Sequence, residues 1–162
     1  MKRIAILLAA LLLTVTSAFA QTGKGIYQSY SNSPGVSAVY ISPAMFRVIG
    51  KLPDIQIRGE KLSFVSVIKS MSGLYMLTSK NIPVSSRIIA EVEKLVASDD
   101  YELLMEAKDS GETVKMYTKG SETVVHDLIM LSVDGPETTF ICLDGKMNRD
   151  ELETILLEKM SK

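Results

Sequence analysis

The sequence predicts an α+β domain in which helices pack on one face of a largely antiparallel sheet. Four stretches rich in strand-forming residues follow one another between residues 101 and 143, and only short turns join them. Turns this short connect antiparallel neighbours. Segments with the 3.6-residue spacing of amphipathic helices lie before and after this region. The predicted order is therefore β-α-β-α-β-β-β-β-α.

The first 20 residues have the pattern of a cleavable signal peptide. Lys2 and Arg3 precede an apolar run from Ile4 to Leu13, and the sequence Ala18-Phe19-Ala20 supplies the small residues of a cleavage site. A membrane anchor would need about 20 apolar residues, which is longer than this run. We therefore expect cleavage between Ala20 and Gln21, with no membrane span, and a periplasmic or secreted product.

Composition and charge limit the function classes further. The chain has 18 basic and 19 acidic residues, and loss of Lys2 and Arg3 with the signal leaves 16 basic ones, a net charge of about −3. Such a balance offers no basic surface for nucleic acid. Cys142 is the only cysteine, so the mature chain is expected to contain no internal disulfide.

Residues 21–35 are predicted to be a flexible leader, and residues 36–162 a single domain. The leader contains Gly, Ser, Gln and Asn without apolar periodicity. A strand is expected over Val36–Ile41. Ser42 and Pro43 suit the start of a short helix with one apolar face and a stop at Gly50; the apolar face would comprise Met45, Phe46 and Ile49.

The middle of the chain contains one ambiguous and one clear region. The structure of residues 51–73 is left open, because Leu62–Met71 fits a short helix or a strand equally well. Leu74–Thr78 is predicted to be a strand. Pro83–Ser98 is predicted to be a helix because its apolar residues form one stripe, namely Ile88, Ile89, Val92, Leu95 and Val96.

The four consecutive strands are predicted over Tyr101–Lys108, Thr113–Thr118, Val124–Val133 and Thr138–Leu143. Alternation places Tyr101, Leu103, Met105 and Ala107 on one face of the first strand. In the third strand, Val125, Ile129, Leu131 and Val133 face one way, and His126, Leu128, Met130 and Ser132 face the other. That strand is apolar on both sides, so it is expected to be central in the sheet.

A final helix is expected after Asn148. The segment Asn148–Glu151 resembles a capping box, with a side chain at the N-cap and Glu three residues later. Leu152, Ile155 and Leu156 supply the apolar stripe of this helix.

Three segments together resemble a known family. These are Gly35–Phe46 (GVSAVYISPAMF), Tyr101–Met105 (YELLM) and Lys108–Tyr117 (KDSGETVKMY). They are similar to a family of small exported proteins of Gram-negative bacteria, catalogued as domain of unknown function 4252. The resemblance covers nearly the whole chain from Gly35 onward. It implies an exported α+β domain and brings no established activity.

Histidine and cysteine are common catalytic residue types, and the chain has one of each, His126 and Cys142. The two are predicted to lie apart. Asp127 follows His126 directly, and neighbours on a strand point to opposite faces. With Val133 opposite Thr138, Cys142 falls opposite about Ile129, roughly 10 Å from His126 along the strand. A structural or solvent-exposed role is expected for His126, and a buried apolar role for Cys142.

No catalytic, cofactor-binding or metal-binding residue is predicted, and no cofactor is expected. One His and one Cys are too few for a zinc site, and the Asp109-Ser110-Gly111-Glu112 segment reads as a hairpin turn and not as a calcium loop. Phosphate-binding glycine motifs are absent from the sequence. Pairs of carboxylates that meet only in the fold are left open, with Glu102, Glu106 and Glu112 as available residues.

The leading functional hypothesis is a non-enzymatic envelope protein that binds an unknown protein partner. Its expected contact surface is the sheet face not covered by helices, where Leu128 and Met130 lie, and a homodimer through that face is possible. The alternative is a periplasmic carrier of a small hydrophobic ligand, with a pocket between sheet and helices. A carboxylate-based hydrolase is a third, weaker alternative.

Overall fold

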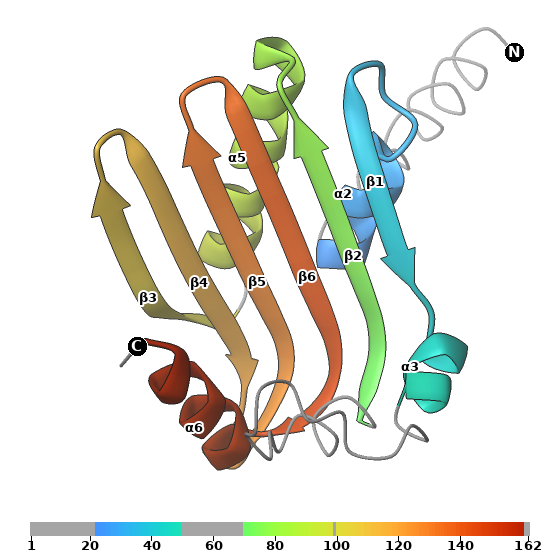
Figure 1. Cartoon of the computed structure of the whole chain (residues 1–162), viewed down its shortest axis with the longest axis vertical. Coiled ribbons are helices and arrows are strands. Elements are labelled where there is room, and N and C mark those ends of the chain that lie inside the picture. The colour runs from blue at the N-terminus through green and yellow to red at the C-terminus, as the bar shows by residue number, and fades with distance from the viewer. Residues whose placement is uncertain (1–21, 50–69, 99, 161–162) are drawn as a thin grey trace, which may run out of the picture.

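The structure is a computed structural model, and it describes residues 22–49, 70–98 and 100–160. The described part contains ten elements (Figure 1). The helices are α2 (Gly23–Tyr30), α3 (Pro43–Ile49), α5 (Ile82–Ser98) and α6 (Arg149–Met160). The strands are β1 (Val36–Ile41), β2 (Met71–Ser79), β3 (Tyr101–Asp109), β4 (Glu112–Gly120), β5 (Val124–Asp134) and β6 (Glu137–Asn148).

All six strands form one antiparallel sheet in the order β1-β2-β6-β5-β4-β3. The predicted α+β class and antiparallel sheet are therefore confirmed, and β5 is an inner strand as expected. The predicted register between β5 and β6 is also confirmed, because Val133 lies opposite Thr138 and Ile129 lies opposite Cys142.

The main core lies between the sheet and helices α2 and α5. Figure 1 shows both helices on the same side of the strands. On α5, Val84, Ile88, Val92 and Leu95 are buried, which confirms most of the predicted stripe. They pack in one cluster with inward side chains of the sheet, including Leu77, Ile129, Leu131, Phe140 and Cys142.

The predicted flexible leader is corrected by the structure over residues 22–35. Thr22 caps helix α2, and its Oγ1 accepts a hydrogen bond from the Gly25 N–H at 3.0 Å. Ile26 is fully buried in the main core. The sequence pattern does not reveal this helix because Gly23 and Gly25 are poor helix formers. Both glycines are buried, and Gly23 lies against Cys142 and Phe140 of β6.

Bulges overturn two of the predicted strand faces. The register of β3 against β4 shifts between Leu103 and Met105, so Leu103 lies opposite Tyr117 but Met105 lies opposite Met116. Tyr101 and Leu103 therefore do not share a face with Met105 and Ala107, since an extra residue reverses the alternation.

A second bulge affects the start of β5. The register shifts between Val125 and Asp127, and Val125 packs in a cluster with Leu128 instead of Ile129. Simple alternation cannot anticipate a bulge, because the extra residue is fixed by local backbone pairing.

Both predicted helix caps outside α5 are present. The Met45 N–H donates to Ser42 Oγ at 3.3 Å, and the Glu151 N–H donates to Asn148 Oδ1 at 3.2 Å. On α3, Phe46 is buried but Met45 is half exposed, so the predicted apolar face of this helix is only partly used.

Helix α6 packs at one end of the other sheet face. Leu152 joins Val125, Leu128 and Met147 in a second, smaller cluster. Figure 1 shows α6 on the side of the sheet away from α5. The expectation that helices cover one face therefore describes α2 and α5, whereas α6 covers one end of the opposite face. Residues 1–20, which are predicted to be a signal peptide, and residues 51–69 lie outside the described residues, as do the side chains of Ile155 and Leu156.

Candidate functional site

The face opposite α2 and α5 displays one row of apolar side chains that crosses the whole sheet. Successive cross-strand pairs join Val39 to Met76, Met76 to Ile141, Ile141 to Met130, Met130 to Met116 and Met116 to Met105. Directly opposite residues of an antiparallel pair point to the same face. We call these six residues the methionine row: Val39, Met76, Ile141, Met130, Met116 and Met105.

The methionine row is accessible to solvent along its length. Val39 is 47% exposed, and the other five side chains are partly buried. In the described part of the chain, α6 lies at one end of this face, and Figure 1 shows no described helix over its middle. Methionine is flexible and polarizable, so a surface with four methionines can adapt to the shape of an apolar partner.

A row of small hydroxyl side chains borders the methionine row on one side. Ser37, Thr78, Thr139 and Ser132 occupy successive positions in the register. The Thr78 and Thr139 hydroxyls are hydrogen-bonded to each other at 3.3 Å, and the Ser132 hydroxyl donates to Glu112 at 3.2 Å. On the other side of the methionine row lie Leu128 and Leu143, which contact the α6 cluster. The surface is thus apolar in its centre and polar along one border.

Cys142 lies on the helix-covered face and is buried against α2. A Cβ atom added at Gly23 would clash with Cys142 Sγ, so α2 can approach the sheet this closely only through a glycine. Burial raises the pKa of the Cys142 thiol well above its usual range, and the nearby charges of Asp127 and Asp144 raise it further. These features favour the neutral thiol, which is not nucleophilic.

Asp127 and Asp144 face each other across β5 and β6. The hydroxyl of Tyr101 donates a hydrogen bond to Asp127 Oδ2 at 3.2 Å. Desolvation raises the pKa of Asp127, and the charge of Asp144 adds to this; the Tyr101 hydrogen bond and the charges of Lys119 and His126 oppose it. The sequence analysis did not single out this pair, because only the β5–β6 register brings the two carboxyl groups together.

The carboxylates considered from the sequence do not converge. Glu102 lies 3.7 Å from Arg149, Glu106 lies 3.2 Å from Lys108, and Glu112 accepts the hydrogen bond from Ser132. Each therefore has a separate partner on the surface. Within the described residues, no group of three or more His, Cys, Asp or Glu side chains is placed to hold a metal ion.

His126 lies in the bulge at the start of β5, and its side chain is exposed. The bulge sits between Val125, opposite Met147, and Asp127, opposite Asp144. Cys142 lies opposite Ile129 further along the strand and is buried. The structure thus does not bring the two residues together.

Three tyrosines from three elements form an aromatic cluster on the helix-covered face beside β1. The Tyr40 and Tyr75 rings are stacked with centroids 5.0 Å apart, and the Tyr27 ring lies 5.4 Å from that of Tyr75. Burial is the largest cause that raises the pKa of Tyr75, to about 12. These ring contacts pack α2 against strands β1 and β2.

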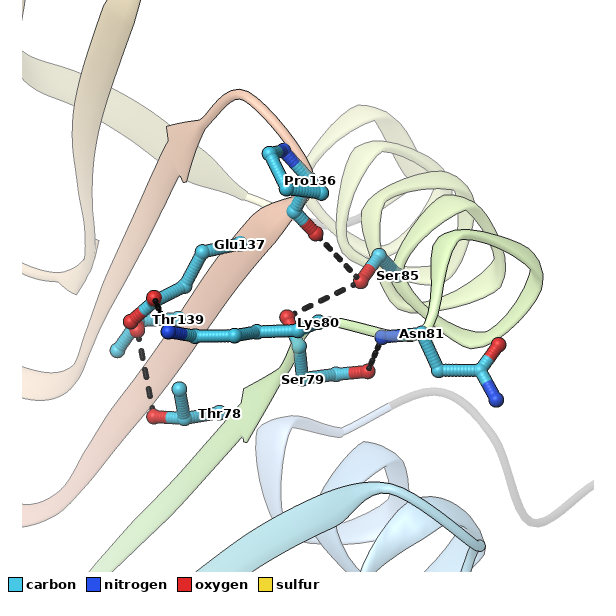
Figure 2. Close-up of polar contacts among 8 residues, drawn as sticks. All are labelled: Thr78, Ser79, Lys80, Asn81, Ser85, Pro136, Glu137 and Thr139. Carbon is cyan, nitrogen blue, oxygen red and sulfur yellow. Dashed lines mark hydrogen bonds and ion pairs between the residues drawn. The ribbon is translucent and has the colours of Figure 1, made fainter.

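Polar side chains at the start of α5 form the network drawn in Figure 2. The buried Ser85 hydroxyl lies within hydrogen-bond distance of the Ser79 carbonyl (3.2 Å) and the Pro136 carbonyl (3.4 Å). The Asn81 N–H donates to Ser79 Oγ at 3.1 Å, and Lys80 pairs with Glu137 at 3.0 Å. These contacts satisfy backbone groups at a helix start and join it to the β5–β6 turn, so their role is structural.

Comparison with known proteins identifies the family. The family model described as Domain of unknown function (DUF4252) matches residues 30–155. The chain belongs to this family. The match covers the whole described sheet and most of α6, so the DUF4252 domain is the α+β unit seen here. No curated protein and no solved structure gives a significant match. Among the described residues, no helix has both the length and the apolar character needed to cross a bilayer.

Proposed function

We propose that this DUF4252 protein is an exported, non-enzymatic binding module of the cell envelope, which contacts a protein partner through the methionine row. The single observation that carries the proposal is the continuous row itself: six strands each contribute one apolar side chain to the same line on an accessible face. Contiguous apolar surface with a polar border is typical of protein interaction sites.

The proposed location rests on the signal-like sequence of residues 1–20. Cleavage after Ala20 would release the protein into the periplasm or the medium. N-terminal sequencing of the protein recovered from the periplasmic fraction tests this directly. A first residue other than Gln21, or recovery only with the cytoplasm, would count against export by this route.

Site-directed photocrosslinking in intact cells tests the proposed surface. A photoreactive amino acid at Met130 places the probe in the middle of the methionine row, and one at Glu93 places it on the exposed side of α5. Both positions belong to the same folded protein but to different surfaces. The crosslinking of the two variants is therefore compared at equal expression. We expect a discrete crosslinked band from position 130 and none from position 93. Equal labelling at both positions would contradict the proposal.

The carrier alternative requires an apolar cavity between sheet and helices. That layer is occupied by Leu77, Ile88, Ile129 and Phe140, each with 0% exposure, which favours binding at the surface instead. Native mass spectrometry of protein purified from its own periplasm separates the two. A reproducible small-molecule adduct would support the carrier, and a clean mass of the chain alone supports the surface module.

The hydrolase alternative rests on Asp127 and Asp144, since a carboxyl with a raised pKa beside a second carboxyl is a pattern used in acid–base catalysis. Asp127 also accepts a hydrogen bond from Tyr101, and the neighbouring Cys142 is buried in the core. These contacts are equally consistent with a structural role for the two carboxylates. A hydrolytic activity that is abolished in Asp144→Asn but unchanged in Glu112→Gln would establish the hydrolase in place of the binding module.

A further inference from the structure

The two edge strands of the described sheet differ in how they are protected. Edge strand β3 carries Glu102, Glu106, Lys108 and Asp109, and its pairing with β4 contains a bulge. Charges and bulges discourage a second sheet from pairing with an edge. The β3 edge is therefore protected against further strand addition.

Edge strand β1 has none of these features. Its sequence, VSAVYI, contains no charged residue, no proline and no glycine, and its six pairs with β2 follow without a shift in register. Residues 37–40 are all exposed, with Val39 at 47% and Tyr40 at 48%. Among the described residues, no strand pairs with the outer edge of β1, so this uncharged edge can present backbone groups to an incoming strand.

We propose that β1 pairs antiparallel with β1 of a second copy of this chain, so that two six-stranded sheets join into one. A two-fold axis perpendicular to the sheet keeps each face on its own side, and it therefore opposes residues of the same parity. Such pairing gives a twelve-stranded sheet in which the helices of both copies lie on the same side. This inference does not depend on the proposed function.

The side chains of β1 select the register of this pairing. When Val39 lies opposite Val39 of the other copy, Ala38 lies opposite Tyr40, so the small side chain leaves room for the large ring. A register centred on Ala38 would instead place two alanines together and oppose Val36 to Tyr40. The Val39 register also joins the two methionine rows end to end, because Val39 is the last residue of each row.

The choice of a second copy as the occupant follows from charge and shape. When a strand pairs antiparallel with its own copy, a charge near the centre of the strand lies close to the same charge on the other copy. VSAVYI carries no charge, whereas β3 paired with itself about Leu104 would place Glu102 opposite Glu106 of the other copy. The uncharged edge is thus compatible with self-pairing, and the charged edge is not.

Sedimentation velocity of the purified processed protein over a concentration series tests the dimer. We expect a concentration-dependent dimer for the natural chain. Val39→Lys should weaken it at least about tenfold, because like charges placed opposite each other are strongly unfavourable. Leu103→Lys is the matched control, since Leu103 is an exposed apolar residue (55%) on the other edge, and it should leave the dimer unchanged.

Disulfide capture tests the register and does not rely on the stability of the lysine variant. Val39→Cys should form an intermolecular disulfide under mild oxidation, because the Cα atoms of directly opposed strand residues lie within disulfide range. Cys142 is buried and does not compete.

Three outcomes of these experiments contradict the proposal. A monomer at all concentrations up to about 100 μM, well above typical specific affinities, would overturn the dimer. Equal weakening by Leu103→Lys and Val39→Lys would overturn the assignment to β1. Faster capture by Ala38→Cys than by Val39→Cys would overturn the register.

Discussion

The two faces of the sheet are built from neighbouring residues of the same strands, but their side chains differ in burial. On the helix-covered face, Leu77 and Phe140 lie opposite each other and are fully buried. On the other face, Met76 and Ile141 lie opposite each other and remain partly exposed. A step of one residue along each strand therefore leads from a buried pair to a partly exposed pair.

This difference shows what apolar alternation does and does not require. A sheet packed on one side needs apolar residues at every second position only, with polar residues between them. Here the intervening positions on β2, β4, β5 and β6 include methionine or isoleucine. The buried core lies on the helix-covered face, and the methionine row is apolar beyond what packing on one side requires. This excess is the reason why we propose the methionine row as the binding surface.

Removal of Phe140 should cause the largest loss of stability. Phe140→Ala is expected to lower the free energy of unfolding by about 3–5 kcal/mol, because it deletes a fully buried ring. Ile141→Ala should lower it by only about 1 kcal/mol, since part of that side chain already contacts water. Urea denaturation of both variants measures the difference, and equal losses would show that the two faces are not distinct.

Addition of one methyl group at Gly23 should give the next largest effect. Gly23→Ala is expected to destabilise by about 1–3 kcal/mol, because its Cβ would meet Cys142 Sγ. In an open helical site the same change stabilises by up to about 1 kcal/mol, so the sign is diagnostic. Lys24→Ala, exposed on the same helix, is the control and should have little effect. A stabilised Gly23→Ala protein would show that α2 does not sit this close to β6.

A polar substitution within the methionine row should affect binding more than folding. Met116→Gln keeps the length of the side chain and is expected to change the free energy of unfolding by less than about 1 kcal/mol, because the site is only partly buried. Crosslinking from position 130 should decline in this variant. Thermal denaturation and crosslink yield measure the two effects. An unfolded Met116→Gln protein would place this residue in the core instead.

Asp127 is a charged residue on the helix-covered face that lies opposite a second carboxylate, Asp144, and its replacement should stabilise the fold slightly. Its folded-state pKa is raised above the unfolded value near 3.8, so the ionised carboxylate costs stability at neutral pH. Asp127→Asn should raise the free energy of unfolding by about 0.2–1 kcal/mol at pH 7, because it removes a like-charge pair. The natural protein recovers this stability as the pH falls through the raised pKa. In urea titrations, the extra stability of Asp127→Asn over the natural protein should therefore shrink toward pH 4. If that difference grew at low pH, the pKa of Asp127 would be lowered in the folded protein and not raised.

Much of the fold follows from the sequence because its strongest signals are local. The α5 stripe, the Ser42 and Asn148 caps, and the β5–β6 register all depend on residues close in the chain, and the structure contains each of them. Helix α2 was not predicted because Ile26 and Gly23 pack on a sheet whose strands are distant in the sequence, and no local pattern records that packing.

The candidate surface was predictable only in outline. Alternation within one strand placed Leu128 and Met130 on the face opposite α2 and α5, which is where the structure has them. The continuous row required the full strand order, since Val39 and Met76 join it through the β2–β6 pairing of distant segments. The β3 bulge was equally decisive, because it turns Met105 onto this face beside Met116.

The pairing of β2 with β6 has a consequence for how the domain is made. Synthesis proceeds from the N-terminus, so Thr78 is made long before Thr139, its partner across the two strands. Strands β1 and β2 precede the rest of the sheet in the chain, but the inner edge of β2 has no partner strand until β6, the last strand, is made. Because β6 lies between β2 and β5, the strand that is made last joins the β1–β2 pair to the β3–β4–β5 meander and completes the sheet.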